Sequence, residues 1–203
     1  TPILFAYLSF PFVKWMSPIP WLYHLYIDRI FGYQGNMLTA NAFNLWALFF
    51  GFEPKPVNVL FFGIPAVWAG YFLFILTGLL IFKKLWGSLT KVNFLIVIFL
   101  FSYAVFLFLP RMHERYFYLS YLFLPTLMMI NKRRMVCYVI ISTIFLLNLY
   151  HYWWYPKIPF LIELLSSLAL VRGIIIVNIC IFLYLLINFF KNGTFDYHRQ
   201  LQH

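Results

Sequence analysis

The fold of this chain is decided by one stretch, which reads Phe108-Leu109-Pro110-Arg111-Met112-His113-Glu114-Arg115-Tyr116-Phe117. The runs 92–109 and 116–130, which flank its polar centre, carry no charged residue. Pro110 lacks an N–H group and clashes with the preceding turn, so a single helix cannot simply continue through it. The stretch therefore predicts a sharp turn between two membrane helices, with its charged and ionisable groups at the membrane surface.

The composition of the chain predicts an integral membrane protein built only from α-helices. Of its 203 residues, 64% are hydrophobic, 24% are aromatic and only 10% are charged, whereas a soluble domain carries about a quarter charged residues. Uninterrupted apolar runs of about 20 residues are typical of helical spans rather than of barrel strands. We interpret the net charge of +10 as loop lysines and arginines on the cytoplasmic side, because the sequence lacks the aromatic–basic interleaving of a nucleic-acid-binding surface.

The hydropathy pattern predicts a polytopic helical bundle that forms a single transmembrane unit over residues 1–203. Five full spans are expected at about 58–82, 92–110, 116–131, 135–153 and 168–190. Residues 1–13 are expected to be the end of a truncated first span, because the chain starts without a methionine or a signal peptide. Residues 14–57 are expected to form an external loop with interfacial helices, one of them at Pro18–Phe31. Residues 191–203 are expected to be a cytoplasmic tail.

The basic residues predict the orientation of the spans. Eight of the 15 lysines and arginines lie in the first and third connections and after the last span, at Lys83, Lys84, Lys91, Lys132, Arg133, Arg134, Lys191 and Arg199. Short basic connections belong on the cytoplasmic side of a membrane. By parity, residues 14–57, 110–116 and 153–167 are predicted to face outward, with Trp153 and Trp154 in an outer aromatic belt.

The turn after Pro110 is the strongest candidate site. Its polar side chains are Arg111, His113, Glu114, Arg115 and Tyr116. On a helix that begins near Met112, the two arginines would lie four residues apart beside the helix N-terminus, which suits a phosphate or pyrophosphate. The histidine and the glutamate could orient a hydroxyl or exchange a proton. Alternatively, the arginines and the histidine only reach lipid headgroups, and the glutamate pairs with its arginine neighbour.

A second polar group lies in the stretch Ala40-Asn41-Ala42-Phe43-Asn44-Leu45-Trp46. Thr39 is a plausible cap for a short helix here, on which Asn41 and Asn44 would share one face. Amides beside a tryptophan ring suit the hydroxyls of a sugar. They suit equally well the backbone groups of irregular chain that enters a bilayer.

The other polar residues are interpreted as interfacial or solvated, with Arg172 and His151 near the outer ends of their spans. Cys137 and Cys180 fall inside apolar runs, so neither a metal site nor a disulfide is predicted. The sequence contains no GxxxxGK[ST] loop, no GxSxG elbow and no HExxH helix. Hydrolysis and nucleotide-driven pumping therefore have no support.

The two motifs, Asn41-Ala42-Phe43-Asn44-Leu45-Trp46 and the Met-His-Glu-Arg-Tyr turn, are separated by two of the predicted spans. With both in view, the chain resembles the C-terminal half of a GT-C glycosyltransferase. It is most similar to bacterial and archaeal mannosyltransferase-like proteins related to the GPI mannosyltransferase of the PIG-V type. The resemblance implies a multi-pass enzyme of the cytoplasmic membrane, or of the ER membrane in a eukaryote.

The resemblance implies transfer of a hexose from a polyprenyl-phosphate sugar to a hydroxyl-bearing glycan or lipid at the outer or lumenal face. The donor phosphate would be bound, or the site shaped, by Arg111, His113, Glu114, Arg115 and Tyr116. The residues implied to line the cavity are Asn41, Asn44 and Trp46. The aspartate base of such families lies in the N-terminal half, so this chain is expected to be inactive alone. The membrane lipids, the donor and the acceptor are the expected partners, with no metal and no further cofactor.

Two other functions are compatible with the same residues. A transporter or flippase of lipid-linked sugars could hold a phosphate with the same arginines. A non-enzymatic membrane scaffold would use the turn only to fix the chain at the surface. A transporter is expected to show charged or broken spans around a central pathway, whereas the polar groups here gather at one face.

Overall fold

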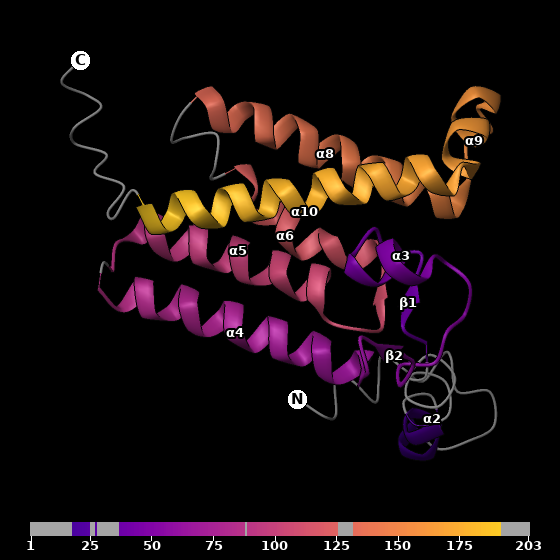
Figure 1. Ribbon diagram of the computed structural model, residues 1–203, viewed down its shortest axis with the longest axis horizontal. Helices are drawn as coiled ribbons and strands as arrows, with labels where there is room; N and C mark the ends of the chain where they lie inside the picture. The colour runs from indigo at the N-terminus through magenta and orange to yellow at the C-terminus, as the bar shows by residue number, and fades with distance from the viewer. Residues whose placement is uncertain (1–17, 25–26, 28–36, 88, 126–131, 192–203) are drawn as a thin grey trace. The chain divides into compact units, whose positions relative to one another are not determined.

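The structure is a computed structural model that describes residues 18–24, 27, 37–87, 89–125 and 132–191 (Figure 1). Internal contacts divide the chain into two units, Thr1–Met37 and Leu38–His203. In the first unit, helix α2 spans Pro18–His24, inside the interfacial helix predicted from the sequence. The remainder of that helix, the expected first span and the tail beyond residue 191 lie outside the described residues.

Four helices of the second unit are long and apolar enough to cross a membrane, as expected for an all-α membrane protein. They are α4 (Ala66–Trp86), α5 (Lys91–Phe108), α8 (Lys132–Trp153) and α10 (Leu168–Lys191). Helix α5 lies at the centre of the packing. In its apolar 18-residue stretch 61% of the residues are buried, whereas the corresponding share in the other three helices is 22% to 28%. It packs on α4 and on α10.

The stretch 116–131, predicted as a span, is not one continuous helix where it is described. A 3-10 turn, η4, covers Glu114–Phe117, and α6 covers only Tyr118–Phe123. Pro125 has no N–H to donate to the Tyr121 carbonyl, which accepts instead from the N–H of Leu124 at 3.2 Å. Residues 126–131 lie outside the described part; among the described residues there are four candidate spans, and the sequence predicted five.

The span predicted at 58–82 begins later than expected. Leu60–Phe61 (β2) and Ile64–Pro65 (β3) pair as an antiparallel hairpin, and α4 starts only at Ala66. The turn of the hairpin has positive φ at Phe62 (50°) and Gly63 (83°). The prediction failed here because hydrophobicity alone does not separate a short apolar strand from the start of an apolar helix.

Aromatic rings hold the end of η4, at Phe117, in the core of the second unit. The ring of Phe117 lies 4.9 Å from those of Tyr103 and Phe106 on α5, and 5.5 Å from that of Phe145 on α8. Tyr103 in turn contacts Phe182 of α10 at 5.2 Å. The chain is therefore held on three helices three residues after Glu114.

The basic loops and the polar turn lie at opposite ends of the four long helices (Figure 1). At one end of this bundle, α5 and α8 begin and α4 and α10 end. The sequence has at least one lysine in the terminal turn of each helix there. The polar turn after α5 lies at the other end, together with α3 (Leu45–Phe50) and α9 (Pro159–Ser166). The predicted basic connections thus lie at the end opposite the polar turn, whereas the side of the membrane stays a prediction.

Helix α4 approaches the end of α5 closely at Gly70. A Cβ atom there would lie 2.6 Å from the carbonyl oxygen of Phe108, 2.9 Å from Cζ2 of Trp46 and 3.1 Å from Cδ of Pro110. The same Phe108 carbonyl accepts a hydrogen bond from Nε1 of Trp46 at 2.9 Å. The absence of a side chain at Gly70 thus lets α4, the end of α5 and the ring of Trp46 meet next to the polar turn.

We expect Gly70→Ala to lower the free energy of unfolding by about 1–3 kcal/mol, because the added methyl meets backbone that cannot move aside. Thermal or denaturant unfolding in detergent micelles measures the change. Gly173→Ala is the matched control, since nothing lies within 4 Å of a Cβ there and alanine favours a helix. Equal losses in the two variants would contradict a close approach at Gly70.

Candidate functional site

The two polar segments found in the sequence meet in space. Strand β1 (Thr39–Ala40) runs parallel to β4 (Met112–His113), with Thr39 opposite Met112 and Ala40 opposite His113. The N–H of Arg111 donates to the carbonyl of Leu38 at 2.8 Å, and Asn41 bridges to His113. The Asn41 segment and the turn after α5 therefore form one continuous structure.

The helix predicted to begin near Met112 begins instead at Glu114. Met112 is extended and paired in β4, and Arg111 has a left-handed backbone with φ 67°, which is uncommon outside glycine. The arrangement of two arginines four apart on one helix was therefore wrong, because Arg111 precedes the strand and Arg115 lies in η4. The strand pairing, which the sequence did not reveal, accounts for the difference.

The charged groups of the turn differ sharply in exposure. Arg111 and Arg115 are exposed, whereas Glu114 is only 1% exposed. Its Oε2 atom has no hydrogen-bond partner among the described residues and lies 3.9 Å from Nδ1 of His113. The alternative Glu114–Arg115 ion pair does not form. The turn thus offers two solvent-facing guanidiniums close to a buried carboxylate.

His113 is held in its neutral form by its surroundings. Burial lowers the pKa of the imidazole most strongly, the Glu114 carboxylate raises it, and the Arg115 guanidinium lowers it again. The net pKa falls below its ordinary value of 6.5. The ring also meets that of Tyr116 edge-on at 5.2 Å. A neutral imidazole keeps one nitrogen able to accept a proton or a hydrogen bond.

Asn44, and not Thr39, caps the short helix α3. Its Oδ1 accepts from the N–H groups of Trp46 and Ala47, each at 3.1 Å, while Thr39 lies in β1 and donates to the same oxygen at 3.4 Å. Asn41 precedes the helix with φ 56°, so the two asparagines do not share a helix face. Asn44 and Trp46 are fully buried, and a role for them in lining a cavity stays a prediction.

Two asparagines of the long helices hold the Asn41–Phe43 segment from the other side. Asn148 of α8 accepts the N–H of Phe43 at 3.1 Å and donates to the carbonyl of Asn41. Asn178 of α10 donates to the carbonyl of Phe43 at 3.0 Å and accepts from the hydroxyl of Tyr103. Both asparagines are 1% exposed. The sequence interpretation missed them, although an isolated amide in an apolar helix is itself a signal of a buried polar contact.

His151 and Arg172 are both half-buried, and their predicted interfacial position stays a prediction. The His151 ring lies 4.7 Å from Phe52, 5.4 Å from Phe43 and 5.2 Å from Trp154. Neither Nδ1 of His151 nor Nε of Arg172 has a hydrogen-bond partner within the described ranges.

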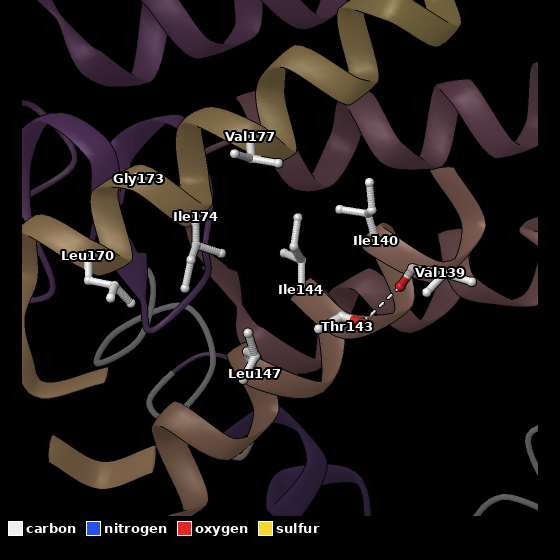
Figure 2. Close-up of a pocket in the computed structure, with 9 residues that line it drawn as sticks. All are labelled: Val139, Ile140, Thr143, Ile144, Leu147, Leu170, Gly173, Ile174 and Val177. Carbon is white, nitrogen blue, oxygen red and sulfur yellow. Dashed lines mark hydrogen bonds between the residues drawn. The ribbon is translucent and has the colours of Figure 1, made fainter. Parts of the chain in front are cut away.

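An apolar groove of about 480 Å³ lies between α8 and α10 (Figure 2). Thr143 is its one polar lining residue, and the hydroxyl donates to the carbonyl of Val139 at 2.9 Å. Ile144, which also lines the groove, belongs to the same buried cluster as Phe43. The groove can hold an apolar chain but offers no group for chemistry, so it is not the reactive part of a site.

Within the described ranges, no group of three or more His, Cys, Asp or Glu side chains could hold a metal ion. No protein family model, no curated protein and no solved structure matches this chain. The likeness to GT-C glycosyltransferases therefore rests on the two motifs, and enzymatic function is a proposal.

We expect Asn178→Ala to lower the free energy of unfolding by about 1–3 kcal/mol, because it leaves the buried Phe43 carbonyl without a donor. Asn188→Ala on the same helix is the control, since that amide bonds only the Tyr184 carbonyl of its own helix. Chemical unfolding in detergent compares the two variants. Equal stability losses would show that the Asn178 contact does not hold the segment.

The lowered pKa of His113 gives the stability a defined pH dependence. The folded pKa lies below the unfolded value, so the neutral ring contributes stability above pH about 6.5 that is lost as the pH falls through the folded pKa. We expect His113→Gln to lose less stability than wild type between about pH 7.5 and pH 5.5. Chemical unfolding of both proteins at the two pH values measures the difference. A His113 imidazole resonance that titrates above the ordinary pKa of 6.5 would refute the prediction.

Proposed function

We propose that the chain is part of a membrane glycosyltransferase that moves a hexose from a polyprenyl-phosphate donor to a hydroxyl of a glycan or lipid. The observation that carries the proposal is the parallel pairing of β1 with β4. It brings together the two motifs on which the GT-C resemblance rests. Residues far apart in the sequence that share one end of a bundle in this way are suited to a common site.

The arginines supply positive charge for the donor phosphate. Arg111 and Arg115 are exposed, and no described carboxylate forms an ion pair with either side chain. A guanidinium matches two phosphate oxygens with parallel hydrogen bonds. When the bond between the sugar carbon and the phosphate oxygen breaks, negative charge grows on the departing phosphate, and fixed positive charge stabilises it.

His113 and Glu114 are suited to positioning rather than to binding charge. The neutral imidazole can accept a hydrogen bond from a hydroxyl, and the Glu114 carboxylate lies 3.9 Å from its Nδ1 atom. By the resemblance, the base that removes the acceptor proton is an aspartate of an N-terminal half. These two residues would then shape the pocket in which donor and acceptor meet.

The groove between α8 and α10 suits the prenyl chain of such a donor. It is apolar, and Val139 and Val177 on its rim are about half exposed. If α8 and α10 cross the membrane, the groove opens toward lipid. Through Ile144 it is next to the cluster of Phe43, whose backbone is held beside the candidate site.

In the proposed function, the polar turn lies at the outer or lumenal face. The basic helix ends are at the opposite end of the bundle, and basic connections belong on the cytoplasmic side. A flippase of lipid-linked sugars is the second candidate, since the same arginines could hold its phosphate. Polar groups along a central pathway would favour a flippase. The two exposed arginines of the turn instead lie together at one end of the described bundle.

The test uses the full natural chain in nanodiscs with polyprenyl-phosphate mannose or glucose, and follows release of free polyprenyl phosphate. We expect Arg111→Ala and Glu114→Gln each to slow release by about 10²–10³, the usual effect of losing one preorganised charged or polar group. Lys157→Ala is the control, because that lysine is exposed in the loop before α9.

Near-normal release in both site variants would contradict the assignment to this turn. Absence of release with either donor from folded protein would contradict the transferase itself. Movement of the lipid-linked sugar across proteoliposomes without transfer would support the flippase instead.

A further inference from the structure

Three apolar side chains of the β2–β3 hairpin are exposed. Leu60, Phe62 and Ile64 are 64%, 85% and 54% exposed. No charged residue occurs from Pro56 to Phe82. A contiguous exposed apolar surface marks a site of interaction with a membrane or another protein.

This surface continues onto one side of α4. Trp68 and Phe72, four residues apart and therefore on one helix face, are 63% and 65% exposed. Ile75 and Leu79 extend the same stripe and are also exposed. Because α4 is a candidate span, this stripe is the part of the helix that lipid would cover. The hairpin is thus continuous with a lipid-facing surface.

The length of α4 sets the depth of the hairpin. Its 21 residues extend about 31 Å at the usual helical rise, close to the roughly 30 Å of a bilayer's hydrocarbon core. If α4 crosses the membrane, the hairpin, which directly precedes its first residue, is at the level of the headgroups. Aromatic residues concentrate at that level in membrane proteins.

The backbone of the hairpin is suited to such a position. Besides the β2–β3 pairing, the N–H of Ala66 donates to the Val59 carbonyl at 2.9 Å, and that of Val67 donates to the Val57 carbonyl at 3.0 Å. Paired backbone groups avoid the cost of unsatisfied ones near hydrocarbon. Phe62 occupies a turn position with φ 50°, where asparagine or glycine is normally favoured. Because the side chain is also exposed, neither the turn conformation nor core packing explains why a phenylalanine occurs there.

The hairpin is also joined to the candidate site. The ring of Phe61 lies 4.8 Å from that of Phe49 and 5.5 Å from that of Trp46. Trp46 donates to the carbonyl of Phe108, two residues before Pro110. The depth of the hairpin in a membrane would therefore set the depth of the polar turn.

We propose that the β2–β3 hairpin is a membrane-interface anchor whose tip, Phe62, inserts among the lipid headgroups and the first acyl carbons of the leaflet beside the polar turn. Its partner is the lipid surface, and the anchor holds Arg111 and Arg115 at headgroup level. The inference depends on membrane insertion of α4 and not on sugar transfer.

The test places a nitroxide at residue 62 through Phe62→Cys, with Cys137 and Cys180 replaced by alanine, in the full chain in bilayers of zwitterionic and anionic phospholipid. We expect the label to collide several-fold more with oxygen, which dissolves in lipid, than with a water-soluble nickel chelate, relative to a label at Lys157→Cys. Phe62→Trp gives a second measurement, in which lipids brominated near the headgroup should quench more fluorescence than in wild type.

Equal nickel accessibility at positions 62 and 157 would overturn the proposal, as would protection from both reagents, which would indicate a protein partner or a second copy of the chain. Unchanged quenching in folded Phe62→Trp would overturn it without any need for the cysteine replacements. Sugar transfer is measured in none of these experiments, so their failure and that of the proposed function are distinguishable.

Discussion

Residues 38–43 run as non-helical chain among apolar helices, and their backbone groups need partners that no helix of their own supplies. The strand β4 and the N–H of Arg111 supply them on one side. The amides of Asn148 and Asn178 supply them on the other. Burying an unpaired amide in such surroundings costs several kcal/mol. The position of this segment, and with it the candidate site, therefore follows from the need to pair its backbone N–H and C=O groups.

The same pairing determines the conformation of the polar turn. Because β4 keeps Met112 and His113 extended, helical structure can begin only at Glu114, and the rings around Phe117 then hold it three residues later. Gly70 allows α4 to come up against the Phe108 carbonyl just before the turn. The charged residues are thus carried by backbone that is fixed at both ends, which is what a preorganised site requires.

The features that could be predicted are those with a local cause. Pro110 ends α5, the apolar runs give long helices, and the lysines mark one end of the bundle, because each depends on neighbouring residues alone. The pairing of Thr39 with Met112 could not be predicted, since two-residue strands have no periodic signal and their partners are separated by two long helices. Thr39 and Asn44 are both good caps, and only the packing of the fold chooses between them. The partners of Asn148 and Asn178 depend on that same packing.

The local costs in the turn bear on whether it is a site or only a surface contact. An arginine that merely reaches lipid headgroups needs no left-handed backbone, yet Arg111 has φ 67°. A scaffold likewise gains nothing from a carboxylate that is 1% exposed and has no hydrogen bond to its Oε2 among the described residues. Backbone strain and unsatisfied buried groups persist in folded proteins where a function needs them. Their coincidence within four residues, beside a neutral histidine and two exposed arginines, supports our proposal that the turn binds a phosphate-bearing ligand.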